Sequence, residues 1–169
     1  MGRVELTFTS DLASPPDRVW SWITSMRGIS QELAPILKMT APQGVTDIAD
    51  VTVEPGQRLF RSWFLLFGVL PIDRSDLTLC SLEPGKGFLE QSPMLSMKLW
   101  RHERKLEASG EGTLLTDRLT FEPRIAAFVT RWFIRTVFNH RHRVLEEHFG
   151  VRGPSKGVRA VFQRCKGGR

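Results

Sequence analysis

Residues 123–149 read PRIAAFVTRWFIRTVFNHRHRVLEEHF, and this stretch decides the fold. After Pro123 it contains no Gly or Pro, and Gly150 follows it directly. Proline suits the first turn of a helix and glycine suits the position just past its end, so the stretch predicts one long helix. At about 100° per residue, one broad and mainly apolar face collects Ile125, Val129, Trp132, Thr136, Val137, His140 and Val144.

The rest of this helix is more polar. A second, weaker apolar stripe runs through Ile134, Phe138, Leu145 and Phe149. We expect the solvent face to hold Arg131, Arg135, Arg141 and Arg143, with Glu146 and Glu147 as salt-bridge partners. His140 lies inside the apolar face, where it is either a hydrogen-bonded core residue or a group that points into a cavity.

Upstream of the long helix the period of the hydrophobic pattern is two, which is typical of half-buried strands. The predicted strands are residues 4–9, 45–53, 58–67, 75–82, 88–92, 97–107 and 113–121. Two short helices, residues 14–26 and 29–34, follow the first strand. The turns at residues 55–56, 84–85 and 109–112 are short, so the strands that they join are antiparallel neighbours.

These elements predict an α+β fold. A curved, seven-stranded antiparallel sheet has one apolar face to bury and a single long C-terminal helix to bury it against, so the sheet must wrap round the helix. Such an arrangement favours a container for a small apolar molecule.

The charge distribution argues against a specific nucleic-acid site. The net charge is +6, but residues 151–169 hold six basic side chains and no acidic one. Residues 1–150 therefore carry equal numbers of both signs. We expect one domain over residues 1–150 and a basic, disordered tail over residues 151–169, because the tail is rich in Gly and basic residues.

Several chemistries lack a signature in the chain. The N-terminal residues MGRVELTFTS contain no apolar signal core, and no apolar run approaches the ~20 residues that span a bilayer. We expect a cytoplasmic protein. His140 and His142 point to different faces of a helix and no cysteine joins them at a ligand spacing, so no metal is predicted. No phosphate loop, GxSxG elbow or dinucleotide fingerprint is present, and no cofactor is expected.

The order of strand, two short helices, six strands and long helix resembles the helix-grip fold of the SRPBCC superfamily, which includes START, Bet v 1-like and polyketide-cyclase proteins. The likeness covers residues 3–150. Short segments add to it: residues 16–20 (PDRVW), 87–90 (GFLE), 100–104 (WRHER), 116–118 (TDR) and 138–142 (FNHRH). The resemblance implies a hydrophobic cavity between the sheet and the long helix. It implies no particular reaction, because lipid carriers and cyclases share the fold.

The last predicted hairpin could carry a polar site. His102 and Arg104 share one strand face, and Asp117 lies on the core face of the next strand. A turn centred between Ser109 and Gly110 places His102 opposite Asp117, whereas a turn one residue later places Arg104 there. Asp117 then either orients His102 as an acid–base group or as a contact for a polar ligand end, or it forms a cross-strand ion pair that stabilises the sheet.

Residues 63–70 form the longest apolar run. They fit a strand end that is buried on both faces. They also fit a cavity mouth that touches a membrane or a partner transiently while ligand loads. The basic tail offers a second possible membrane contact.

The sequence thus favours a protein that binds a small hydrophobic molecule, such as a lipid, an aromatic compound or a polyketide-like compound. The expected cavity lining is Trp63, Trp100, Leu115, Phe121, Trp132 and His140. The expected polar anchor is His102, Arg104 and Asp117. The alternative is a polyketide cyclase or dehydratase with His102 or His140 as acid–base residue and Asp117 as its partner. A third possibility is an interaction protein that docks through residues 63–70 and the tail.

Overall fold

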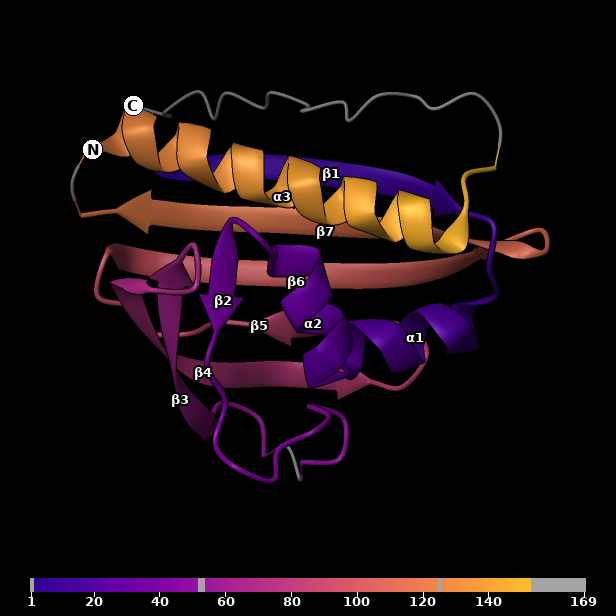
Figure 1. Ribbon diagram of the computed structural model, residues 1–169, viewed down its shortest axis with the longest axis horizontal. Helices are drawn as coiled ribbons and strands as arrows, with labels where there is room; N and C mark the ends of the chain where they lie inside the picture. The colour runs from indigo at the N-terminus through magenta and orange to yellow at the C-terminus, as the bar shows by residue number, and fades with distance from the viewer. Residues whose placement is uncertain (1, 52–53, 125, 153–169) are drawn as a thin grey trace, which may run out of the picture.

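The long helix lies along one face of a single curled sheet in the computed structural model, which describes residues 2–51, 54–124 and 126–152 (Figure 1). The strands are β1 (Val4–Leu12), β2 (Leu37–Met39), β3 (Arg58–Leu66), β4 (Leu70–Glu83), β5 (Gly87–Glu90), β6 (Met97–Ser109) and β7 (Gly112–Pro123). The helices are α1 (Pro16–Thr24), α2 (Met26–Leu33) and α3 (Ala127–Phe149). The predicted helix-grip fold is confirmed.

All neighbouring strands of the sheet are antiparallel, in the order β1-β7-β6-β5-β4-β3-β2. β1 and β2 therefore lie at opposite edges although they follow each other in sequence, and the chain crosses between them through α1 and α2. α3 contacts β1, β7 and α2, so it closes the open side of the curled sheet (Figure 1).

The second strand differs from the prediction. Residues 45–51 form bends and an isolated bridge between Ser25 and Asp47, and residues 52–53 lie outside the described residues. The strand after the short helices is β2, which pairs with the end of β3. The prediction of a strand over residues 45–53 from their alternating pattern is wrong. Of the described residues 45–51 only Ile48 is buried, so this segment has no buried strand face.

The helix α3 starts later than predicted and buries a different face. Pro123 ends β7, and the helix begins at Ala127 after Ala126, whose φ is 42°. Its buried side chains are Val137, Phe138, Arg141, His142, Leu145 and Phe149. The predicted second stripe is therefore the main buried one, and Arg141 is not on the solvent face. The hydrophobic pattern missed this because charged partners on other elements compensate Arg141 and His142.

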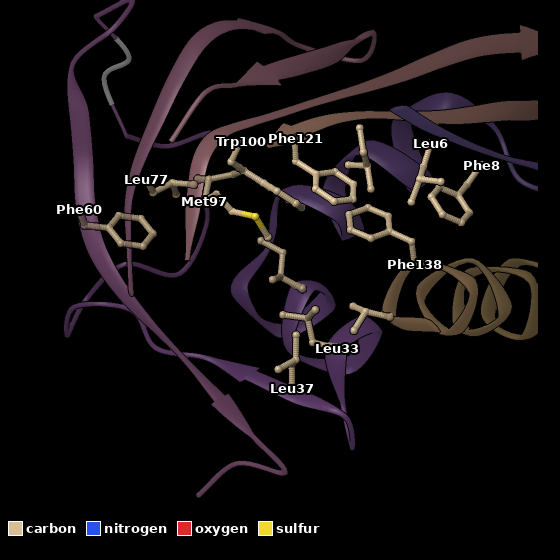
Figure 2. Close-up of a cluster of buried hydrophobic side chains, with 14 residues drawn as sticks. Leu6, Phe8, Leu33, Leu37, Phe60, Leu77, Met97, Trp100, Phe121 and Phe138 are labelled. Carbon is tan, nitrogen blue, oxygen red and sulfur yellow. The ribbon is translucent and has the colours of Figure 1, made fainter. Parts of the chain in front are cut away.

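Two hydrophobic clusters fill the space between sheet and helices. The larger one gathers Phe8, Trp100, Phe121 and Phe138 with leucines from β1, α2, β2 and β4 (Figure 2). The smaller one packs α1 against the C-terminal half of α3 and includes Val19, Ile23, Leu115 and Leu145. The larger cluster lies on the side of the molecule where the cavity is found.

The ends of the described chain meet the sheet. Val151 forms a bridge to Leu12, and the Arg152 amide donates to the Asp11 carbonyl. The predicted basic tail covers residues 151–169, of which residues 153–169 lie outside the described residues. Within the described part of the chain, no helix has the length and hydropathy of a membrane span.

Candidate functional site

A cavity of about 280 Å³ lies between the sheet and α3. Figure 2 shows part of its wall, with Leu33 and Leu37 facing Leu77, Met97 and Trp100. The helix supplies Phe133, Ile134, Val137 and Phe138 on the other side. Ligand pockets commonly measure ~300–1,000 Å³, so this cavity suits a small molecule. Its wall is mostly aliphatic and aromatic, which favours an apolar ligand.

The cavity opens between β4 and the first turns of α3. Ile72 on β4 and Val129 on α3 both line the cavity, yet they are 40% and 45% exposed. Side chains that line a cavity and also reach solvent mark its opening. We call the gap between Ile72 and Val129 the cavity mouth.

One polar group of the cavity wall lies on β4. Asp73 accepts hydrogen bonds from the backbone amides of Arg74, Leu95 and Ser96, and from the Ser96 hydroxyl. Its carboxylate is therefore fully engaged in holding the loop between β5 and β6. Ser75, which is 1% exposed, differs: its hydroxyl has no hydrogen-bond partner among the described residues. A buried hydroxyl without a partner is costly, so Ser75 is available to a ligand atom.

A second polar group lies where β5, β6 and α3 meet. Glu90, His102 and Arg141 all line the cavity. His102 Nδ1 is 3.6 Å from Glu90 Oε2, and its other ring nitrogen points at Asp117, with Nε2 2.8 Å from Oδ1. The Arg141 guanidinium lies over the Phe138 ring, 5.0 Å from its centroid. Among the described residues, the cavity wall thus contains one permanent cation, Arg141, and one imidazole, His102.

Behind these residues is a buried ion pair between neighbouring strands. Arg104 on β6 and Asp117 on β7 are opposite in register. Arg104 Nε donates to Asp117 Oδ1 and Nη2 donates to Oδ2, both at 2.7 Å. Both side chains are fully buried. Such a bidentate, fully desolvated pair fixes the geometry of the groups bonded to it.

Glu32 on α2 joins this pair to the cavity. Its Oε2 accepts from Arg104 Nη1 at 3.1 Å, and from Arg141 Nε and Nη2 at 3.0 and 2.8 Å. Glu32 is fully buried, and its Oε1 has no hydrogen-bond partner among the described residues. One carboxylate therefore bridges two guanidinium groups, and it orients Arg141 along the cavity wall.

The ionisation of the central pair follows from these contacts. Burial alone would raise the pKa of Asp117, but the charges of Arg104 and His102 and the hydrogen bonds from both hold it well below its ordinary value. Burial likewise opposes the charge on Arg104, but the Asp117 and Glu32 carboxylates outweigh this effect, so the pKa of Arg104 is raised. Asp117 is therefore a carboxylate that accepts hydrogen bonds and donates none.

His142 extends the network to β1. Its Nε2 lies 3.0 Å from Asp117 Oδ2, and its Nδ1 lies 2.8 Å from the Ser10 hydroxyl. Ser10 donates its one proton to Glu146 Oε1 at 2.8 Å. The network therefore links β1, α2, β6, β7 and α3.

Comparison with known proteins places the chain in a family. Residues 10–149 match the family described as "Domain of unknown function (DUF8410)". The chain belongs to this family. The description of DUF8410 assigns no activity, and no curated protein matches the chain.

Solved structures show that the DUF8410 domain shares its fold with other proteins. Protein CV1439 from Chromobacterium violaceum is 15% identical, with a TM-score of 0.62 over 86% of this chain and 99% of its own. Ara h 8.0201 is 11% identical, with a TM-score of 0.60 over 88% and 98%. DynU16, a putative protein of the dynemicin biosynthetic locus, is 17% identical, with a TM-score of 0.54 over 86% and 48%. At these identities the likeness shows the fold alone.

The structure places the predicted apolar lining at three locations. Trp100 lines the cavity. Leu115 and Phe121 are buried in the two hydrophobic clusters, behind the cavity wall. Trp63 and Trp132 are 42% and 65% exposed and lie outside the cavity, so the prediction that they line it is wrong. For Trp132 the cause is the rotated face of α3. For Trp63 it is strand parity, since Phe60 and Ser62 of β3 face inward.

The predicted polar anchor is assembled as one network. Arg104 faces Asp117, as the later turn position implies, and His102 still reaches Asp117 from a neighbouring register position. Of the three, His102 lines the cavity, while Arg104 and Asp117 lie behind it. His140 lies outside the cavity and hydrogen-bonds through Nε2 to the Ala34 carbonyl oxygen. The prediction that His140 lines the cavity is therefore wrong.

Glu32, Arg141 and His142 were not predicted from the sequence as members of the network. Glu32 lies one residue before Leu33 and three after Ile29, on the apolar face of α2. Arg141 and His142 lie between Phe138 and Leu145 on the buried stripe of α3. A charge inside an apolar stripe is the signal that could have found them. Using this signal on α3 requires knowing which of its two apolar stripes is buried, and the sequence alone did not decide this.

Proposed function

We propose that this domain binds a small, mostly apolar molecule whose polar end carries a hydrogen-bond acceptor. The observation that carries the proposal is a mostly apolar cavity with an open mouth and, among the described residues, a single guanidinium in its wall. The apolar wall supplies burial for the hydrophobic part of the ligand. Arg141 supplies a donor for a carboxylate or carbonyl oxygen.

The hydrogen bonds of Arg141 leave room for such a contact. Nε and Nη2 both donate to Glu32 Oε2. The third nitrogen, Nη1, makes no hydrogen bond to any described residue, and Arg141 lines the cavity. Because Glu32 holds the guanidinium in place, little conformational entropy would be lost when a ligand oxygen binds to it. Ser75 on β4 offers a second hydrogen bond to an oxygenated ligand.

Two C10 probes that differ at one end test this proposal. Decanoate and 1-decanol have the same chain, and titration calorimetry measures both dissociation constants. A hydrogen bond to a charged group contributes about 1.5–3 kcal/mol, so we expect decanoate to bind at least tenfold more tightly than decanol. Binding of neither probe, under conditions where the protein is folded, would contradict the proposal.

Variants of neighbouring arginines locate the polar end. Arg141→Gln should remove most of the preference for decanoate, and Arg141→Lys should keep part of it. Arg143, two residues further along α3, is exposed and serves as the matched control. Arg143→Gln should leave both dissociation constants unchanged. A preference for decanoate that survives in Arg141→Gln would show that the acceptor binds elsewhere.

A specific observation also favours an acid–base function. His102 lines the cavity, is 3% exposed and has Asp117 bonded to Nε2, which orients the ring and leaves Nδ1 near Glu90. This is the arrangement of an oriented general acid–base residue. The second candidate function is therefore cyclisation or dehydration of a polyketide-like or aromatic substrate.

A triketide thioester, followed by mass spectrometry for loss of water, tests the second candidate. His102→Ala should abolish the loss of water, and His140→Ala should keep it because His140 lies outside the cavity. No turnover by the wild type, or equal turnover in both variants, would exclude His102 as the acid–base residue for this substrate class.

A further inference from the structure

Large apolar side chains are exposed on the two elements that reach the cavity mouth, which are the hairpin between β3 and β4 and the start of α3. On the hairpin between β3 and β4, Phe67 and Val69 are 68% and 78% exposed, and Leu70 is 57% exposed. On the first turns of α3, Phe128 and Trp132 are 80% and 65% exposed. We call these five residues the mouth surface. A cluster of exposed apolar residues often marks an interaction surface, whereas single exposed apolar residues are common and carry no such meaning.

Each half of the mouth surface is close in sequence to a residue of the opening. Ile72 follows the hairpin and Val129 follows Phe128, and both line the cavity as well as reaching solvent. In Figure 1 the hairpin and the first turns of α3 lie towards the same end of the molecule. A ligand that leaves the cavity through the mouth therefore passes beside the hairpin and the start of α3. Phe128 and Trp132 themselves line a separate hollow with Val4 of β1, away from the face of α3 that lines the cavity.

Basic side chains lie beside both halves of the mouth surface. Residues 64–72 carry no charge, and every charged side chain of α3 before Glu146 is an arginine. Arg131 and Arg135 line a second hollow together with Phe128 and Trp132. Lys38 lies on β2 beside the hairpin strand β3. Asp73, the acidic residue next to Ile72, is buried.

We propose that the mouth surface docks on an anionic lipid bilayer. The hairpin and the start of α3 would insert their apolar side chains at the interface, and the arginines would face the lipid phosphates and acidic headgroups. A bilayer fits the opening better than a protein partner does. It offers a continuous apolar phase to the cavity mouth, whereas a protein packed across both halves would seal the opening.

Sedimentation with vesicles tests the docking on the full chain without any added ligand. Vesicles of phosphatidylcholine alone are compared with vesicles that contain 30% phosphatidylserine, at low and high salt. We expect binding to the anionic vesicles, weakened at least fivefold by removal of phosphatidylserine or by 0.5 M NaCl. Decanoate titration reports on the cavity separately, so this proposal and the proposed function can fail independently.

Paired variants locate the contact. Phe67→Asn/Val69→Ser changes the hairpin, where asparagine tolerates the positive φ of 50° at residue 67. Phe128→Ser/Trp132→Ser changes the helix. Each pair should weaken vesicle binding at least tenfold and leave the decanoate dissociation constant within twofold. Val151→Ser, an exposed apolar residue beyond the other end of α3, is the control and should change nothing.

Three outcomes would overturn the proposal. The first is absence of vesicle binding. The second is binding that survives both paired variants but disappears when Lys156, Arg159, Arg164 and Lys166 are changed to Gln, which would assign it to the tail. The third is a dimer in the absence of vesicles that the paired variants dissociate, which would make a second copy of the chain the occupant of the mouth surface.

Discussion

Arg104 and Asp117 form a bidentate ion pair across β6 and β7, with Arg104 Nε and Nη2 each 2.7 Å from a carboxylate oxygen and no solvent access to either side chain. Neither residue touches the cavity. Their neighbours do, because His102 bonds to Asp117 and Arg141 shares Glu32 with Arg104. The pair therefore supports the polar part of the cavity wall from behind.

Asp117→Asn should destabilise the protein strongly. The substitution removes one charge of a buried pair and leaves Arg104 with Glu32 as its remaining carboxylate partner. Breaking a buried pair in this way costs about 3–5 kcal/mol of the free energy of unfolding, measured by urea denaturation. Asp76→Asn is the matched control, since Asp76 pairs with Arg61 on the exposed outer side of the sheet. Equal effects of the two substitutions would contradict the assignment.

Stability should fall in acid because of the same carboxylate. The pKa of Asp117 is lower in the folded state than in the unfolded chain, where it is about 4. The unfolded state therefore takes up the proton first. The contribution of Asp117 is complete above about pH 5 and is lost as the pH falls through 4 towards the folded-state pKa.

Urea denaturation at pH 7, 5, 4 and 3 measures this loss. The contribution of Asp117 to the free energy of unfolding of the wild type should be the same at pH 7 and pH 5. Below pH 4 this contribution should fall by up to about 1.4 kcal/mol per pH unit. The slope below pH 4 should be smaller in Asp117→Asn. Identical slopes in the two proteins would assign the acid sensitivity to other carboxylates.

Arg141 and Arg143 should behave very differently although they are two residues apart on α3. Arg141→Met leaves Glu32 with Arg104 alone and should cost about 2–4 kcal/mol of the free energy of unfolding. Arg143→Met changes an exposed side chain and should stay within about 0.5 kcal/mol. Thermal and urea unfolding of both variants checks this. A larger loss of stability in Arg143→Met than in Arg141→Met would mean that Arg141 lies on the solvent face of α3, as expected from the sequence.

Ser75→Leu should fill part of the cavity. The substitution removes a buried hydroxyl that lacks a partner and adds apolar volume where the cavity has room. We expect the free energy of unfolding to rise by about 1 kcal/mol, while decanoate binding weakens at least tenfold. A loss of about 1–3 kcal/mol would indicate overpacking of a wall that has no room.

The fold could be predicted because its signals are local. The alternation on either side of the turn at residues 109–112 defines β6 and β7, and Gly150 marks the end of α3. β2 could not be predicted, because three residues carry too little pattern and the strand exists through its pairing with Phe64, Leu65 and Leu66.

The site was only partly predictable because its partners are distant in sequence. His102, Arg104 and Asp117 belong to one hairpin, and strand parity brings them together on one face. Arg141 and Glu32 are 109 residues apart, and each looks like a surface residue until the other is placed beside it. Choosing the buried face of α3 needed that pairing, which no local pattern supplies.

The pairing of β1 with β7 has a consequence for synthesis on the ribosome. β1 leaves the ribosome before the other strands of the sheet, but its hydrogen-bonding partner β7 is made more than 100 residues later. Ser10 and His142, which are in contact in the folded domain, are 132 positions apart. Until then β1 presents an unpaired strand edge with Leu6, Phe8 and Leu12 uncovered. The nascent chain should therefore need protection from aggregation until β7 and α3 have been made, because contacts this non-local form last.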